Sequence, residues 1–89
     1  MHAIITVIGK DQVGIIAMVS QLLAEHNVNI LDITQTILQD YFTMIMLVDT
    51  EAASVPFATL AVKLEEAGKT RELCIQIQRE DIFNAMHRI

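Results

Sequence analysis

The residues best suited to chemistry lie where the first apolar segment of the chain ends. Residues 3–8 are apolar and mostly β-branched, and they run directly into Gly9-Lys10-Asp11-Gln12-Val13-Gly14-Ile15. This pattern predicts a strand that passes through a short glycine-bounded loop into a helix. Such a junction directs backbone N–H groups and the positive end of a helix dipole at one point. The sequence therefore predicts a binding site for a small anion at this loop.

No other group of residues has the spacing of a catalytic or metal site. The histidines His2, His26 and His87 are far apart in the sequence, and Cys74 has no basic residue predicted beside it to activate the thiol. The sequence contains no recognisable Ser/His/Asp or Cys/His arrangement, phosphate-binding loop or dinucleotide fingerprint. We therefore expect a non-catalytic, ligand-sensing module that has no catalytic residue, no metal and no cofactor.

Length and composition indicate one small domain that carries more apolar surface than it can bury. The chain has 89 residues, and 53% of them are hydrophobic. A domain of this size buries only about 60–65% of the surface that its unfolded chain exposes. Because a surplus of exposed apolar surface marks interaction sites, we expect self-association, in the simplest case as a homodimer.

The charge pattern excludes some classes of partner. The formal net charge is −5, and the six basic residues are scattered rather than clustered, which argues against direct binding of nucleic acid or of an anionic membrane surface. One cysteine permits no intrachain disulfide, as is typical of a reducing cytosol. No apolar run reaches the length of about 20 residues that a membrane span needs. We therefore expect a cytoplasmic, soluble protein.

The first half of the chain predicts a strand, a helix and a hairpin. Residues 2–9 form the first strand, Asp11 is positioned to cap the helix that follows, and His26-Asn27 ends that helix. Residues 28–38 predict a second strand, and a tight connection at Gln39-Asp40 leads into a third strand over residues 41–49.

The second half predicts a helix, a strand and a terminal helix. Ser54 is a suitable N-cap with Pro56 in the first turn, and Gly68 is positioned to end the helix. The alternation of apolar and polar residues over residues 73–78 predicts a half-buried fourth strand. Residues 80–89 predict a short helix with Glu80 and Asp81 at its amino end.

This βαββαβ order predicts an α+β, ferredoxin-like plait. Two right-handed crossovers place both helices on one face of an antiparallel four-stranded sheet. The first and third strands are apolar on both alternation sets, so they belong in the centre of the sheet. Their helix-free face would then expose an apolar patch, which either the terminal helix or a second copy of the chain must cover.

These residues make the chain similar to ACT domains, small regulatory plaits found in many enzymes of amino-acid metabolism. The matching segments are residues 4–8 with the loop of residues 9–15, and Asn27-Val28-Asn29-Ile30-Leu31-Asp32-Ile33. The resemblance covers residues 3–78, and the segment from residue 80 to residue 89 resembles the tail of one subgroup. The chain looks most like stand-alone ACT proteins of the uncharacterised family related to the regulator of the glycine cleavage system.

The resemblance implies that an effector amino acid binds at a subunit interface, against the first strand–helix loop and the start of the second strand. Carried over to this chain, the implied ligand-binding residues are Asp11, Gln12, Val13, Gly14, Ile15, Asn29 and Ile30. Asn29 would face the loop from the second strand, and Asp32 could meet an ammonium group, although it lies on the other alternation set. Many relatives have proline where this chain has Val13, which reduces the preorganisation of the loop.

Several of these assignments have simpler alternatives. Gly9 and Gly14 can be turn and packing residues, Asp11 can be a helix cap, and Asn29 can satisfy the backbone of an edge strand. The chain is then either a metabolite sensor that acts through a metabolic or regulatory protein, or an interaction module with an empty ligand site. A role in transcriptional regulation is one option for such a module. An enzyme is the third hypothesis, for which no nucleophile with a positioned base is found. The geometry of the dimer, edge to edge or face to face, stays open.

Overall fold

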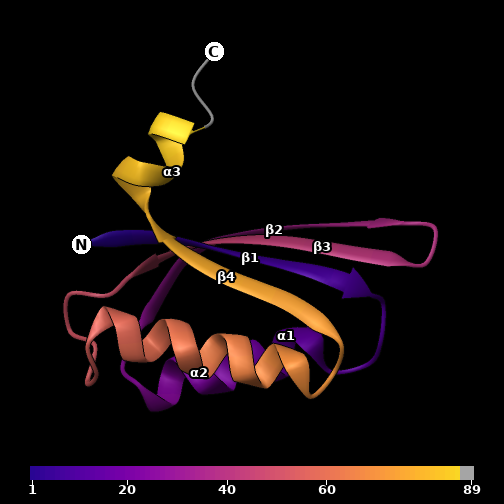
Figure 1. The fold of residues 1–89 in the computed structure, drawn as a ribbon, viewed down its shortest axis with the longest axis horizontal. Helices are drawn as coiled ribbons and strands as arrows, with labels where there is room; N and C mark the ends of the chain where they lie inside the picture. The colour runs from indigo at the N-terminus through magenta and orange to yellow at the C-terminus, as the bar shows by residue number, and fades with distance from the viewer. Residues whose placement is uncertain (87–89) are drawn as a thin grey trace.

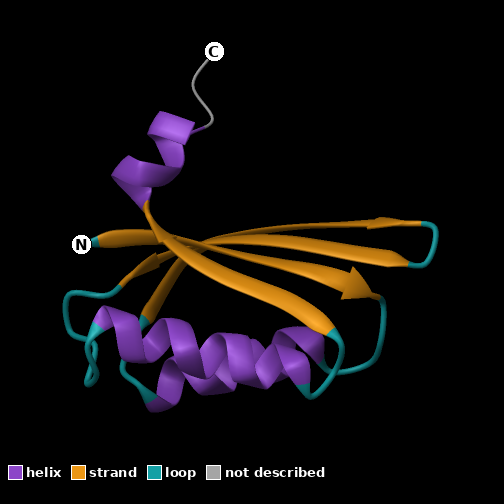
Figure 2. Ribbon diagram, viewed as in Figure 1, coloured by secondary structure: helices purple, strands orange, loops and turns teal. Residues whose placement is uncertain are grey.

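Four strands form one antiparallel sheet in the order β2-β3-β1-β4, and two helices cover one face of it (Figures 1 and 2). The computed structural model describes residues 1–86. Its elements are β1 (His2–Lys10), α1 (Ile15–Glu25), β2 (Asn29–Leu38), β3 (Tyr41–Asp49), α2 (Phe57–Lys69), β4 (Leu73–Arg79) and α3 (Glu80–Met86). The predicted ferredoxin-like plait is confirmed, with β1 and β3 in the centre. Residues 87–89 of the predicted terminal helix lie outside the described residues.

The core lies between the sheet and the two helices. Alternate residues of the central strands point into it and are completely buried, among them Ile5, Val7, Met44 and Met46. The apolar faces of α1 and α2 pack against them with fully buried side chains, namely Val19, Leu23, Leu60 and Leu64. Each such side chain contributes about 1.5–3 kcal/mol through the removal of apolar surface from water.

Both helices begin later than predicted. The N-cap of α1 is Gly14, not Asp11, and the N-cap of α2 is Pro56, not Ser54, and neither cap makes a side-chain hydrogen bond. Asp11 lies four residues before the first residue of α1, and its N–H donates to the carbonyl of Asp40 at 2.8 Å. The N–H of Ser54 similarly donates to the carbonyl of His26 at 2.9 Å. Both residues therefore hold connecting segments rather than helix ends.

Gly68 does not terminate α2, as the sequence suggested, but lies inside it. The helix continues to Lys69, and Gly68 is buried against β4. A Cβ atom at this position would lie 2.6 Å from the carbonyl oxygen of Leu73 and 2.9 Å from Cγ1 of Ile75. The absence of a side chain therefore lets α2 approach β4 closely.

The face of the sheet opposite α1 and α2, here called the open face, and the β2 edge are not covered by other elements. Every residue of β2 from Leu31 to Leu38 is exposed, and the β2–β3 hairpin extends beyond the helices (Figure 1). The helix α3 contacts β1 and β4 but rises away from the sheet, on the side opposite α1 and α2. Because Ile8 and Ile45 remain 51% and 41% exposed, α3 does not cover the open face.

Candidate functional site

The loop between β1 and α1 is tied to two neighbouring connections. The N–H of Asp11 donates to Asp40 in the β2–β3 turn, and the side-chain amide of Gln12 donates to the carbonyl of Arg71 at 3.0 Å and to that of Lys10 at 3.3 Å. Gln12 therefore positions the loop, and its amide nitrogen is already in use. The carboxylate of Asp11 is exposed beside the loop, where it can interact with a cation.

Gly14 turns the chain into α1. Its φ of 89° is left-handed, which a side chain disfavours, and its carbonyl accepts the first bond of the helix from Met18 at 3.0 Å. The N–H groups of the first turn have no partner within the helix, so they form the donor set of an anion site. Val13, at the tip of the loop, is 97% exposed, which leaves the approach to these groups open.

Arg71 is a member of this site that the sequence analysis missed. It lies between α2 and β4, and its Nη1 donates to the carbonyl of Val13 at 3.2 Å. The same nitrogen lies 3.3 Å from where a Cβ of Gly14 would be. Topology could have revealed it, because the segment before β4 and the segment after β1 lie at the same end of the sheet, where Leu73 pairs with Gly9. The loop therefore carries a guanidinium charge beside the free N–H groups.

Two of the predicted ligand-binding residues have packing roles in the core. Ile15 is the first residue of α1 and its side chain is 2% exposed within the core, so only its backbone can take part in the site. Ile30 is half-buried and packs against the core at the start of β2. Only the half-buried side chain of Ile30 keeps some surface that a ligand could contact.

Asn29 does not face the loop within one protomer. It pairs with Asp49 of β3, which pairs with His2 of β1. The loop follows Lys10, at the other end of the same strand. Seven to eight residues of extended strand, or about 25 Å, separate the two ends. The expectation that Asn29 meets the loop therefore fails inside a single chain.

A β-bulge changes which face Asp32 occupies. The β2–β3 register shifts between Ile30 and Asp32, so that Asn29 pairs with Asp49 and Asp32 with Leu47. Asp49 and Leu47 are two residues apart in one strand, so Asn29 and Asp32 lie on the same face of the sheet. Simple alternation had placed them on opposite faces. The carboxylate of Asp32 also accepts a bond from the N–H of Ile33 at 2.9 Å.

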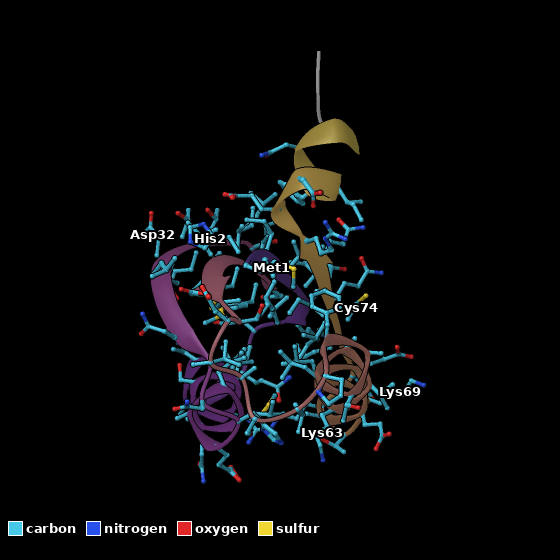
Figure 3. All side chains as sticks on the ribbon, turned by 90° about the vertical axis from the view of Figure 1, so that its left-hand side faces the viewer. Met1, His2, Asp32, Lys63, Lys69 and Cys74 are labelled. Carbon is cyan, nitrogen blue, oxygen red and sulfur yellow. The ribbon has the colours of Figure 1, made fainter. Side chains whose placement is uncertain are left out.

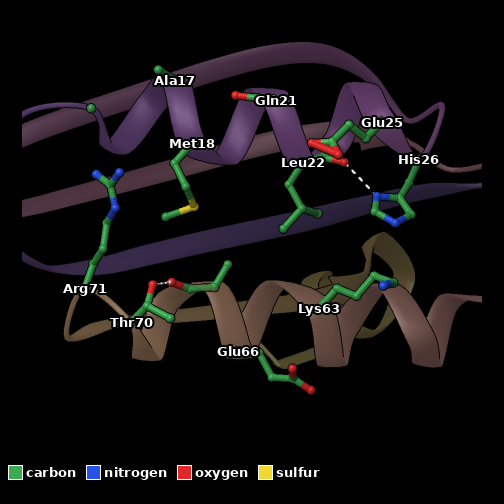
Figure 4. A pocket seen from close by; sticks show the side chains of 12 residues that line it. Ala17, Met18, Gln21, Leu22, Glu25, His26, Lys63, Glu66, Thr70 and Arg71 are labelled. Atoms are coloured by element: carbon green, nitrogen blue, oxygen red, sulfur yellow. Dashed lines mark hydrogen bonds between the residues drawn. The ribbon is translucent and has the colours of Figure 1, made fainter.

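A groove of about 640 Å³ runs between α1 and α2 (Figure 4), and Gly14 is among the residues that line it. Met18 and Leu22 extend from α1 toward α2 and form its apolar floor, and Arg71 lies at the loop end. Lys63 and His26 lie at the far end, where Nδ1 of His26 is 2.8 Å from the carbonyl of Leu22. The groove therefore joins an apolar surface to the cationic side of the loop.

Ionisable side chains outside the loop include one group with a shifted pKa and no cluster of metal-ligand type among the described residues. Among the residues that the structure describes, no three His, Cys, Asp or Glu side chains gather closely enough to hold a metal. The pKa of Asp49 is lowered, chiefly because its carboxylate accepts a bond from the N–H of Glu51 at 3.0 Å and also because the terminal ammonium lies 3.4 Å away. Asp49 stands at the Asn29 end of the sheet.

None of the described helices has the length and apolarity for crossing a membrane.

Comparison with known proteins agrees with the fold. A family model described as an ACT domain matches residues 1–78. A UPF0237 protein of Clostridium acetobutylicum is 58% identical over 89 residues, which is all of both chains. An ACT domain protein from Streptococcus pneumoniae has 46% identity and a TM-score of 0.82, with 98% of each chain covered. A candidate glycine cleavage system transcriptional repressor has 25% identity and a TM-score of 0.72, over 86% of this chain and 44% of that one.

Proposed function

The chain belongs to the ACT domain family, and we propose that it is a non-catalytic regulatory module of the cytoplasm. In this proposal two copies form a homodimer that binds a small metabolite, an amino acid, at the subunit interface. Ligand binding stabilises the dimer and changes its affinity for a metabolic or regulatory protein. By linkage, a partner that prefers the liganded dimer must also tighten the binding of the amino acid.

The separation of the two halves of the site is the observation that carries this proposal. The loop lies at the Lys10 end of the sheet and Asn29 at the His2 end. A two-fold axis that pairs the β2 edges antiparallel would place the start of one β2 beside the end of the other. Because the end of β2 pairs with Tyr41, which pairs with Lys10, Asn29 of each copy would approach the loop of its partner.

The β2 edge is chemically suited to such pairing. Its only charged residue between Asn29 and Leu38 is Asp32, and it has no proline, glycine or lysine. Edge strands that stay single usually carry such protective residues. A register centred between Ile33 and Thr34 would bring position 29 opposite position 38, and it would form two identical sites per dimer, as an isologous interface requires.

An amino acid suits the groups that this arrangement would assemble. The free N–H groups at the start of α1, with Arg71 behind them, favour a carboxylate. The exposed carboxylate of Asp11 favours an ammonium group, and the amide of Asn29 can both donate and accept. These groups lie within a few residues of the apolar groove between α1 and α2, which leaves space for an apolar side chain.

The test is thermal melting of the protein against the twenty amino acids, with the mass measured by light scattering in the same samples. We expect one or two amino acids to raise the midpoint by several degrees, in a sample whose mass is that of two copies or more. Val13→Glu places a negative charge on a fully exposed side chain, so it should abolish the response without unfolding the chain. Val62→Glu, at an exposed valine of α2, is the matched control and should keep the response. No shift with any amino acid would contradict the proposal.

One observation favours a second candidate, an interaction module without a ligand. The side-chain amide of Gln12 donates to the carbonyls of Lys10 and Arg71, and one nitrogen of Arg71 donates to the carbonyl of Val13. Part of the hydrogen-bonding capacity of these two side chains is therefore used within the chain. In that case the exposed strands bind another protein, such as one in transcriptional regulation of amino-acid metabolism, as the name of the candidate repressor suggests. With a net charge of −5 the chain would act through that protein and not on DNA. Under this candidate, partner binding survives Val13→Glu.

A further inference from the structure

The open face of the sheet is a continuous surface of apolar and uncharged polar side chains. Its centre is formed by alternate residues of all four strands, namely Ile4, Thr6, Ile8, Thr43, Ile45, Leu47, Thr34, Thr36, Cys74 and Gln76. Ile8 is 51% and Ile45 41% exposed. The chain therefore leaves two isoleucines of its central strands in water, at positions that its own helices cannot reach.

Charge is displaced from this face. Its charged side chains stand at the margins, with His2 and Lys10 at the ends of β1, Asp49 beside His2 on β3, and Asp32 on the outer strand. Figure 3 shows Asp32 and His2 on the side of the sheet away from Lys63 and Lys69, which belong to the helix layer. In a chain with a net charge of −5, the open face is the surface on which two identical copies repel each other least.

The marginal charges that lie nearest to α3 are already paired inside the chain. Nδ1 of His2 lies 3.5 Å from a carboxylate oxygen of Glu80. The terminal ammonium lies 3.4 Å from Asp49. A partner that packs on this face therefore has to neutralise few charges, which favours an uncharged surface over a basic or acidic one.

The helix α3 extends this face outward. It rises from the β1–β4 corner on the same side, with Ile82 46% exposed and Phe83 half-buried. An occupant of the face must lie beside α3. Two copies related by a two-fold axis would each place α3 along the border of the other copy, so α3 and the open face would be buried together.

The available area agrees with a second copy of this kind. Four strands spaced about 4.8 Å apart, over seven residues of about 3.3 Å, present a projected area of about 450 Å². The short helix α3 adds about 100 Å². A stable interface buries about 800 Å² per partner, so one pair of faces forms a dimer only at high protein concentration. Two faces joined along their β2 edges would exceed this area.

We propose that the open face binds the open face of a second copy, so that edge-paired dimers stack into a tetramer. The occupant is thus this chain itself, and each copy uses its β2 edge for one contact and its open face with α3 for another. The face contact follows from its own observations, and its strength in solution increases if the edge dimer of the proposed function forms.

The experiment measures mass by light scattering for three single variants over a wide range of protein concentration. Ile45→Lys places a charge at the centre of the open face, Ile33→Lys places one on the β2 edge, and Val62→Lys is the control on the outer side of α2. We expect four copies for the wild type and for the control, and two copies for each of the other variants. Like charges that meet across a two-fold axis oppose each contact.

The outcomes separate the two contacts. If the edge contact alone fails, the wild type has two copies and Ile45→Lys has one, which still supports the face contact. If Ile45→Lys has the same mass as the wild type, the face contact is overturned, whatever happens to the edge.

The thiol of Cys74 gives a second measurement that needs no variant to fold. It is exposed on the open face, in register with Ile8, and it is the only cysteine in the chain. We expect its rate of reaction with a thiol reagent to fall severalfold as protein concentration rises. A rate that does not depend on concentration, in a sample whose mass does rise, would overturn the proposal.

Discussion

The two edge strands of the sheet send isoleucines to the same face, with opposite results. On β4, Ile75 is 3% exposed because α2 packs directly beneath it. On β2, Ile33 and Ile37 pair with the buried residues Met46 and Phe42, yet they stay 39% and 54% exposed. Burial in this fold therefore follows from the reach of the helices and not from hydrophobic pattern alone. The apolar residues of β2 lie beyond that reach and stay exposed.

The largest expected effect contrasts Ile75→Lys with Ile33→Lys. A lysine at position 75 would be buried without a partner, which costs at least about 4 kcal/mol and unfolds much of a small domain. A lysine at position 33 reaches water, so the free energy of unfolding of the monomer should change by less than about 0.5 kcal/mol. Urea denaturation followed by circular dichroism measures both. Equal losses of stability would mean that the two edges are equally covered.

The next effect concerns the close contact that covers β4. Gly68→Ala adds a Cβ that would lie 2.6 Å from a backbone oxygen of Leu73, so α2 must move away. We expect a loss of about 1–3 kcal/mol, as for other overpacked sites. Ala61→Gly, in the same helix and half-buried, is the control and should cost about 1 kcal/mol through helix propensity. A stabilised Gly68→Ala protein would show that the contact is looser than described.

A smaller effect is expected at the loop. Gly14→Ala forces an L side chain into a φ of 89°, which costs about 1–2 kcal/mol. Gly14→Asn should cost less, because asparagine tolerates this conformation. Thermal melting of the two variants without any ligand compares them. If alanine and asparagine cost the same, the loop has changed conformation and the N–H donor set is not held as described.

The smallest effect is a pH dependence at the Asn29 end of the sheet. The pKa of Asp49 is lowered from 3.8 by its bonds to the Glu51 N–H and to the terminal ammonium. Its contribution to stability is therefore present above pH 3.8 and is lost as pH falls through the lower, folded value. Asp49→Asn should lose this part of the acid dependence and keep the rest. An unchanged acid profile of melting temperatures would contradict this role.

The sequence predicted the elements and their order because apolar periodicity decides them. The central place of β1 and β3 follows from their two apolar sets, although only one set of each strand is buried. The helix caps were wrong, since Asp11 and Ser54 have the residue types of N-caps but donate their N–H groups to other connections. Gly68 was misassigned for a related reason. A glycine near a helix end suggests a terminus, whereas here the approach of β4 requires it.

The site was predictable as a set of local motifs but not as an arrangement. The loop was found, because strand, glycine and helix follow one another in sequence. Arg71 was missed since it joins the loop only through the sheet register. The bulge that brings Asp32 to the face of Asn29 leaves no clear mark in the alternation pattern. The distance between Asn29 and the loop also follows only from the three-dimensional path of β2.

The most direct test of the two-subunit site is complementation between two defective variants. Val13→Glu removes the loop half, Asn29→Ala removes the strand half, and each should abolish binding of the amino acid that most raises the melting temperature. In a mixed dimer, one of the two sites combines the intact loop of one copy with Asn29 of the other. Isothermal titration of the refolded mixture should then recover about a quarter of the wild-type sites. A mixture that binds no better than either variant alone would contradict the account.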